Sequence, residues 1–197
     1  MGIRMGEYFL IAYHGTIVGG LHVLKPFANP HSNLKYPCVY LSTNKALSSL
    51  YIWSRDYKWM TFEIREDGLP IYNEAFKNCL LEFYGGVKGY IYTCVADFEI
   101  DENTNIQHAV ISKKPVNIHD VDIVDDAYER ILQYEKDGMI IINRYESLSD
   151  KQKNRDRNMI LSAITRLELL KGEHPLSKFV SDKFPDFWEE ALRKTKV

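Results

Sequence analysis

YHGT (Tyr13–Thr16) and VYLSTNKALSSLY (Val39–Tyr51) are the two stretches on which our interpretation of this sequence rests. The first ends a mostly apolar and aromatic strand on a histidine, a glycine and a hydroxyl side chain. A glycine lets a ligand approach the backbone closely, and histidine and threonine supply hydrogen-bonding groups. His14, Gly15 and Thr16 are therefore suited to hold a ribose by its hydroxyls, although a strand-end histidine can also be purely structural.

The second stretch predicts a strand that carries Tyr40, a turn at Ser42, and a helix that carries Ser48 and Tyr51. The two tyrosines are eleven residues apart, about three helical turns less the bend between strand and helix. This spacing can bring the second ring back over the cavity that the first ring lines. Two facing rings form a slot for a flat heteroaromatic ring, and a serine hydroxyl beside the slot can bind a carboxamide.

Together the two stretches resemble the NAD-binding core of ADP-ribosyltransferases of the diphtheria-toxin and poly(ADP-ribose) polymerase type. These proteins share a histidine–glycine pair ending an early strand, a strand tyrosine, a helix serine eight residues later and a second tyrosine at eleven. The matching residues are His14, Gly15, Tyr40, Ser48 and Tyr51. The resemblance covers residues 9–55 well and residues 85–120 loosely.

The resemblance implies a split, mostly antiparallel sheet that binds NAD as a co-substrate. It assigns NAD binding to His14, Gly15, Thr16, Tyr40, Ser42, Ser48 and Tyr51. By that resemblance the histidine would bond the ADP-ribose portion, and the glycine backbone and Ser48 would hold the nicotinamide carboxamide. The rings of Tyr40 and Tyr51 would sandwich the nicotinamide.

The third element of the family is a catalytic glutamate at the start of a late strand. Counting back from Pro115 places Gln107 at this position, which makes Gln107 and Tyr40 the expected catalytic residues. A glutamine can orient a ribose hydroxyl but supplies no negative charge. The acids Glu99, Asp101 and Glu102 could replace it only if the alignment were shifted by several residues.

Three functions remain open from the sequence. The first is an NAD-dependent mono-ADP-ribosyltransferase or NAD glycohydrolase, which passes ADP-ribose to a protein, a nucleic acid or water. The second is a catalytically silent module that binds NAD or ADP-ribose, which the glutamine favours. The third is an RNA 2′-phosphotransferase, which would want several arginines around a phosphate, whereas the arginines before the C-terminal helices are scattered.

The remaining sequence predicts an α+β fold, with a mostly antiparallel sheet followed by a helical C-terminal appendage. The expected strands are Cys38–Ser42, Trp59–Ile64, Leu69–Glu74, Gly89–Ile100 and one or two within Gln107–Val124. The expected helices are Thr43–Ser54, Glu74–Tyr84, Asp125–Gly138, Ser149–Gly172 and His174–Thr195, the last broken at Pro185. Met139–Asn143 is a buried strand or the start of a helix. We expect residues 1–147 to form the NAD-binding domain and residues 148–197 to pack on it.

Composition restricts the class of protein further. The net charge of −2 argues against a basic nucleic-acid-binding face, and Lys151–Arg157 (KQKNRDR) is either a solvated helix face or an RNA contact. Three cysteines without a CxxC spacing argue against a disulfide framework or a zinc site, and indicate buried thiols in a reducing cytoplasm. No run of about 18 apolar residues occurs, so we expect no membrane span.

Overall fold

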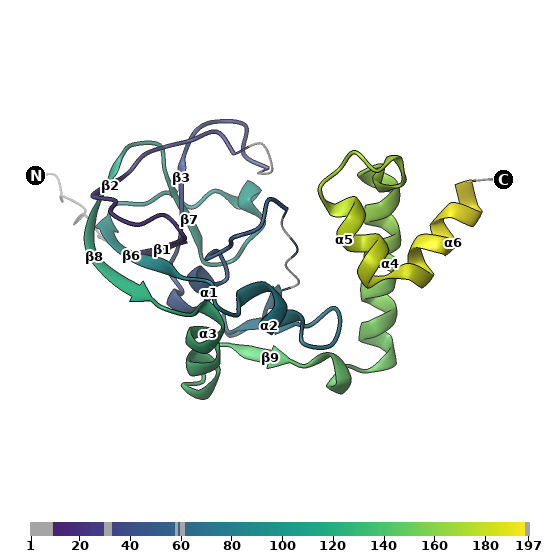
Figure 1. The fold of residues 1–197 in the computed structure, drawn as a ribbon. Helices are drawn as coiled ribbons and strands as arrows, with labels where there is room; N and C mark the ends of the chain where they lie inside the picture. Colours follow the sequence, from purple (N-terminus) through teal and green to yellow (C-terminus); the bar gives the residue numbers. More distant parts are fainter. Residues whose placement is uncertain (1–9, 30–32, 58, 60–61, 196–197) are drawn as a thin grey trace, which may run out of the picture. The chain divides into compact units, whose positions relative to one another are not determined.

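The computed structural model describes residues 10–29, 33–57, 59 and 62–195, and it shows an α+β fold (Figure 1). The larger sheet is curled and holds six strands in the spatial order β2–β8–β6–β1–β3–β7, and each recorded pair of neighbours is antiparallel. These strands are β1 (Leu10–Thr16), β2 (Val23–Leu24), β3 (Val39–Ser42), β6 (Gly89–Ala96), β7 (Ala109–Ser112) and β8 (Val116–Val124). The α+β class and the antiparallel sheet are thus confirmed.

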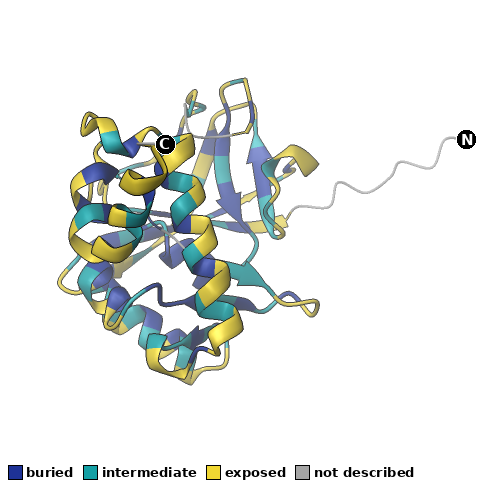
Figure 2. Ribbon diagram, turned by 90° about the vertical axis from the view of Figure 1, so that its right-hand side faces the viewer, coloured by how far each residue is buried: buried dark blue, intermediate teal, exposed yellow. Residues whose placement is uncertain are grey.

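One face of the larger sheet packs into an apolar core. The buried members of this core are Ala12, Leu24, Val39, Leu41, Tyr92, Cys94, Phe98, Val110 and Val116. Figure 2 shows the strands of this sheet mainly as buried and intermediate residues, whereas the helices carry many exposed residues. Because successive residues of a strand point to opposite faces, Tyr13 and Gly15 lie on the face of β1 opposite the core residue Ala12. Helix α1 (Lys45–Ser49) packs against β1.

The expected helix Thr43–Ser54, with Thr43 or Asn44 as its N-cap, is observed as α1, which begins at Lys45 and ends earlier, at Ser49. The side chain of Asn44 accepts a hydrogen bond from the Leu47 N–H, which makes Asn44 the N-cap. The N–H groups of Tyr51 and Ile52 bond to carbonyls three residues back, so a tighter turn replaces the α-helix after Ser49.

Helix α2 (Cys79–Tyr84) starts five residues later than the expected Glu74. The Glu74 N–H bonds to the Asn143 carbonyl, and its carboxylate accepts from the Tyr145 N–H, so tertiary contacts hold this segment in a non-helical form. Asn78 has a φ of 61°, a left-handed conformation that interrupts a right-handed helix. The expected helix start was therefore wrong, and the end before Gly85 was right.

A second, three-stranded sheet has the order β4–β5–β9, formed by β4 (Phe62–Ile64), β5 (Pro70–Asn73) and β9 (Ile141–Asn143). The turn between β4 and β5 is closed by a hydrogen bond from the Arg65 N–H to the Leu69 carbonyl, and Gly68 adopts a φ of 87°. The sequence REDG (Arg65–Gly68) between the two expected strands predicts a hairpin-like turn, and the antiparallel pair of β4 and β5 confirms it. Of the two structures that the sequence allowed for Met139–Asn143, a strand or the start of a helix, the structure shows the strand β9.

The chain divides into two compact units. The first comprises Met1–Ser54, Phe62–Tyr72 and Leu80–Ile141, and holds the larger sheet, α1 and α3 (Ala127–Lys136). The second comprises Arg55–Thr61, Asn73–Cys79 and Ile142–Val197. Besides the C-terminal helices, the second unit therefore includes two short segments from the first half of the chain.

Three helices dominate the second unit: α4 (Asp150–Arg166), α5 (Leu176–Lys183) and α6 (Pro185–Thr195). A capping box of Ser149 and Gln152 begins α4, and the chain breaks between α5 and α6 before Pro185, as predicted. Helix α6 packs against both α4 and α5.

The sequence predicts a buried side of the last two helices formed by Leu176, Phe179, Val180, Phe184, Phe187, Trp188 and Leu192. Phe187 and Trp188 are half-buried. Leu176, Phe179, Val180 and Phe184 are buried as expected. Leu192, by contrast, is 37% exposed. Ala191 is buried instead, because the small side chain is on the face of α6 that packs against its neighbours.

All three cysteine side chains are buried, and the described residues contain no disulfide, in line with the expected core thiols. None of the helices in the described part of the chain combines the length and hydropathy that crossing a membrane requires.

Candidate functional site

The larger sheet is nearly split between β1 and β3. Strand β1 pairs with β6 along its whole length, from Leu10 opposite Ala96 to Thr16 opposite Tyr90. Between β1 and β3 the described residues record a single register pair, Tyr13 opposite Ser42. Past this pair the two backbones no longer form a ladder.

His14 bridges the two strands where the ladder stops. Its Nδ1 lies 2.9 Å from the carbonyl oxygen of Tyr40. Because a carbonyl oxygen can only accept, Nδ1 carries the proton, and Nε2 of the neutral ring is left as an acceptor. Burial lowers the pKa of His14 from its ordinary value, and the hydrogen bond to Tyr40 offsets only part of that effect. The ring is therefore neutral at neutral pH, with Nε2 able to accept from a hydroxyl.

Gly15 lies directly against helix α1. A Cβ atom added to Gly15 would lie 1.9 Å from the carbonyl oxygen of Ser48, a distance that no side chain can occupy. The same carbonyl accepts the N–H of Tyr51 at 3.1 Å. The structure thus brings together Gly15, Ser48 and Tyr51, which the sequence predicts to share a site. It also shows that close packing of β1 and α1 alone requires a glycine here.

The hydroxyl groups at the site already take part in local hydrogen bonds. The Ser48 hydroxyl donates to the Lys45 carbonyl at 2.7 Å, and its side chain is buried. The Ser42 hydroxyl accepts from the Asn44 N–H at 3.0 Å, and the Thr16 hydroxyl accepts from the Val18 N–H at 3.2 Å. A hydroxyl retains further accepting capacity in each case. Ser42 and Thr16 therefore have structural roles in turns beside the strand ends.

The two tyrosines are half-buried in different surroundings. Tyr40 packs beside Cys38 and Ile111, and its ring lies edge-on to that of Phe27, with 5.8 Å between ring centroids. Because Tyr40 alternates with the core residues Val39 and Leu41, it lies on the face of β3 opposite the main core. Gly15 lies on the corresponding face of β1, whereas His14, two residues from the core residue Ala12, lies on the other face and reaches the Tyr40 backbone from there. Burial raises the pKa of Tyr51 above its ordinary value.

Gln107 is exposed in the turn that precedes β7. Strand β7 pairs with β3, with Ile111 opposite Tyr40 and Ala109 opposite Ser42. Paired residues point to the same face, so the β7 side chains nearest to Tyr40 are apolar. The strand itself therefore offers no carboxylate beside the expected nicotinamide slot.

His108, next to Gln107, is held more firmly than sequence reasoning suggests. Its Nε2 donates to the Gly68 carbonyl oxygen at 2.8 Å, and its Nδ1 lies 3.2 Å from the Thr43 hydroxyl oxygen. The Thr43 N–H also bonds to the His108 carbonyl at 2.9 Å. The residue adopts a φ of 68°, which an unconstrained histidine rarely does. His108 thus joins the start of β7 to the turn before α1.

The nearby acids Glu99 and Asp101 are both engaged by other side chains. Glu99 forms an isolated antiparallel bridge with Ile111, which places two strand spacings, about 10 Å, between the backbones of Glu99 and Tyr40. Its carboxylate is in an ion pair with Lys113 at 2.6 Å. Asp101 accepts a hydrogen bond from the Tyr36 hydroxyl, which raises the pKa of that hydroxyl to about 12.

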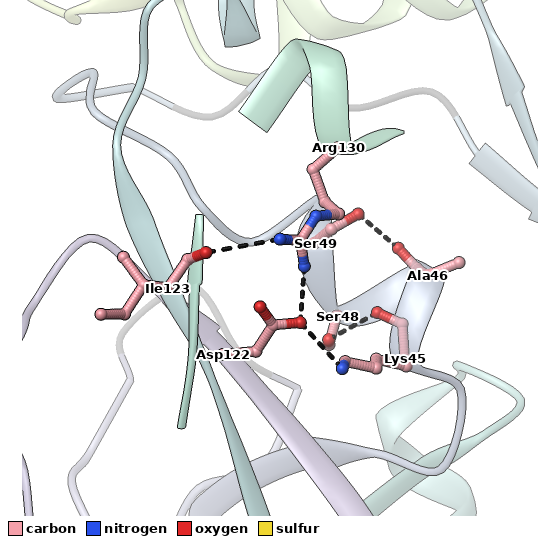
Figure 3. A network of polar contacts seen from close by, with 7 residues as sticks. All are labelled: Lys45, Ala46, Ser48, Ser49, Asp122, Ile123 and Arg130. Atoms are coloured by element: carbon pink, nitrogen blue, oxygen red, sulfur yellow. Dashed lines mark hydrogen bonds and ion pairs between the residues drawn. The ribbon is translucent and has the colours of Figure 1, made fainter. Parts of the chain in front are cut away.

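A charged network missed by sequence reasoning holds α1 in place (Figure 3). The Asp122 carboxylate on β8 binds Lys45 of α1 at 2.8 Å and Arg130 of α3 at 2.5 Å. Burial alone would raise the pKa of Asp122, but the hydrogen bonds from Arg130 and Lys45 lower it overall. Asp122 is opposite Ile91, which is opposite Gly15, so the network lies on the same face of the sheet as the β1–α1 contact, two strands away.

No protein-family model matches this chain, and searches of curated proteins and of solved structures likewise found no match. A functional conclusion therefore depends on the geometry of these residues.

Proposed function

We propose that this chain binds NAD at the split between β1 and β3 and cleaves the bond between nicotinamide and ribose, as ADP-ribosyltransferases do. The observation that carries the proposal is the bridge from His14 to the Tyr40 carbonyl, which lies where the ladder between the two strands ends. The resemblance in sequence includes both of these residues, which are 26 positions apart in the chain.

The contacts around the split support specific roles. The acceptor Nε2 of His14 suits a ribose hydroxyl, which donates. The packing of β1 on α1 places the Gly15 backbone against the Ser48 backbone. As the resemblance implies, the Gly15 backbone and the Ser48 hydroxyl would hold the nicotinamide carboxamide. The rings of Tyr40 and Tyr51 would enclose the nicotinamide. In NAD this ring is a cationic pyridinium, which leaves as neutral nicotinamide and hands the positive charge to the ribose.

The acceptor of the ADP-ribose is a protein, a nucleic acid or water. The ribose passes through an oxocarbenium-like state, which a nearby anion stabilises. Gln107, next to β7, would orient a ribose hydroxyl without supplying that charge. This difference predicts slow turnover.

One observation favours a second candidate, an NAD-binding module without catalysis. The β7 residues opposite Tyr40 and Ser42 are Ile111 and Ala109, and the carboxylate of Glu99 is engaged by Lys113. In this alternative the same cleft residues bind NAD and no anion assists bond breaking.

Release of nicotinamide from NAD distinguishes the two candidates. We expect measurable release by the wild-type protein, and an increase of about tenfold or more in Gln107→Glu, because the new carboxylate supplies the missing charge. Asn117→Asp is the matched control, since it makes the same change of an amide to a carboxylate at an exposed position of β8. Binding without release, rescued by Gln107→Glu, would favour the silent module, and absence of NAD binding would refute both.

A further inference from the structure

The second compact unit contains a cavity of about 360 Å³, a size typical of small-molecule sites. Helix α4, the start of α6, the 3₁₀ turn Tyr145–Ser147 and the segment 75–76 form its wall. Three basic side chains and three aromatic rings are among the lining residues: Lys153, Arg157, Lys183, Phe76, Tyr145 and Phe187.

Each basic group at this cavity lies over one of the rings. The distances from the charged group to the ring centroid are 5.0 Å for Lys153 over Tyr145, 5.0 Å for Lys183 over Phe76 and 5.6 Å for Arg157 over Phe187. The negative face of an aromatic ring attracts a cation. The rings thus help to hold three positive charges at the wall of one cavity.

Two of these cations retain binding capacity for an anion. Within the described residues, Lys153 has no carboxylate partner. Arg157 bonds to Glu190, which also receives Lys194, and a guanidinium has five N–H donors, so further donors remain for oxygen atoms. Lysine and arginine are the side chains that bind phosphate groups in proteins.

The cavity is not lined by positive charge alone. Asp156 and Asp186 also line it; the Asp156 side chain is largely buried and pairs with Arg155 at 3.8 Å, and a carboxylate accepts more than one hydrogen bond. A carboxylate accepts hydrogen bonds, and the amino group of a flat heteroaromatic ring is a suitable donor. Cations, aromatic rings and a buried acceptor in one small cavity therefore match a ligand that is flat at one end and anionic at the other.

The basic run that the sequence analysis left open contributes to this cavity. Lys153 and Arg157 are four residues apart, which places them on the same side of α4. Lys151 and Arg155 of the same run are exposed and are not among the lining residues. The run therefore has two faces, of which one meets the cavity.

We propose that this cavity binds a phosphorylated nucleoside, with Lys153 and Arg157 at the phosphate and the aromatic residues beside the base. The site lies within the second unit, whereas the residues proposed to bind NAD lie within the first. Nucleotide binding in this cavity can therefore be tested independently of the proposed NAD cleavage.

Calorimetric titration of the full chain with AMP tests the site. We expect binding to the wild-type protein and at least tenfold weaker binding to Lys153→Ala, with Lys151→Ala as the matched control that leaves affinity unchanged. Adenosine and inorganic phosphate, each of which lacks one half of the ligand, should bind more weakly than AMP. If Lys153→Ala lowers the thermal midpoint, Lys153→Gln, which keeps the side-chain length, replaces it.

Because AMP is also part of NAD, the His14→Ala variant separates the two sites. The cavity proposal predicts that AMP still binds this variant and that adding Lys153→Ala removes the binding. It is overturned if AMP does not bind the wild-type chain. It is equally overturned if His14→Ala abolishes AMP binding while Lys153→Ala leaves it unchanged, a result that would support the NAD site alone.

Discussion

Strand β1 meets its two neighbours in opposite ways. Along β6 every residue from Leu10 to Thr16 has a partner, and Ala12, Tyr92 and Cys94 of this pair are buried in the apolar core. Toward β3 the register holds only the pair of Tyr13 and Ser42, and a side chain, His14, makes the next link. A complete ladder leaves no backbone group for a ligand, whereas an interrupted one leaves groups that a ligand can use. We infer that the β6 side of β1 determines stability and the β3 side determines function.

The largest expected effect is on the β6 side. Tyr92 is 1% exposed, and its hydroxyl donates to the Val18 carbonyl and accepts from the Leu21 N–H. Tyr92→Ala should lower the free energy of unfolding by about 4 kcal/mol, because it leaves a cavity in the core. Tyr40→Ala, at a half-buried position on the β3 side, should cost roughly half as much. Denaturant unfolding measures the free energy of unfolding of both variants. Equal losses in the two variants would contradict the proposed difference between the β6 and β3 sides of β1.

The next effect is at the contact between β1 and α1. Gly15→Ala should lower the free energy of unfolding by about 3 kcal/mol, because the new methyl group would meet the Ser48 carbonyl and force α1 to move. Gly20→Ala is the control, since Gly20 has a positive φ but no atom within 4 Å of a new Cβ, and should cost about 1 kcal/mol. Denaturant unfolding of Gly15→Ala, Gly20→Ala and the wild-type protein measures these differences. If the two variants were equally stable, α1 would not pack on Gly15 as described.

A smaller effect concerns the network that holds α1. Asp122→Asn should lower the free energy of unfolding by about 1 to 2 kcal/mol at neutral pH, because Lys45 and Arg130 lose their shared carboxylate. The folded state lowers the pKa of Asp122 below its ordinary 3.8, so the stabilisation is complete above about pH 4 and disappears as pH falls through the lowered value.

Unfolding curves from pH 7 down to pH 2 follow this change. The difference between the wild-type protein and Asp122→Asn should close at acid pH. Asp120→Asn, at an exposed position of the same strand, should behave like the wild type throughout. A difference between wild type and Asp122→Asn that did not depend on pH would mean that the ion pairs are not the cause.

The smallest effect on stability comes from His14. Its pKa is lowered in the folded state from the ordinary 6.5, so its contribution to stability is complete above pH 6.5 and disappears as pH falls through the lowered value. The same protonation removes the Nε2 acceptor, so NAD binding should weaken over that window too. His14→Gln should lose both pH dependences, as followed by thermal melts and by titration with NAD. If the stability or the NAD binding of His14→Gln still depended on pH in this range, a group other than His14 would be the cause.

Much of the fold follows from local patterns in the sequence. The bend at Pro115, the caps at Asn44 and Asp126 and the REDG turn all depend on the backbone preferences of a few neighbouring residues. The expected start of α2 failed because Glu74 is bound by Asn143 and Tyr145, about 70 positions away in the chain. Only the folded chain reveals such contacts.

In the candidate site, too, some features follow from local sequence and others depend on contacts between distant segments. Spacing and residue type suggested His14, Gly15, Tyr40, Ser48 and Tyr51. The structure shows three links among them, from His14 to Tyr40, from Gly15 to Ser48 and from Tyr51 to Ser48. The incomplete register between β1 and β3, the anchoring of α1 by Asp122 and the cavity in the second unit join distant segments. Neither periodicity nor a short motif could have predicted them.

Calorimetric titration of NAD into the wild-type chain and into His14→Ala tests the central claim most directly. His119→Ala, an exposed histidine on β8, is the matched control, and thermal melts of all three proteins verify folding. We predict one NAD site in the wild type and in the control, and an affinity at least tenfold weaker in His14→Ala, because the ribose hydroxyl loses its acceptor. Absence of NAD binding to the wild type, or equal affinity in the folded His14→Ala variant, would contradict the account.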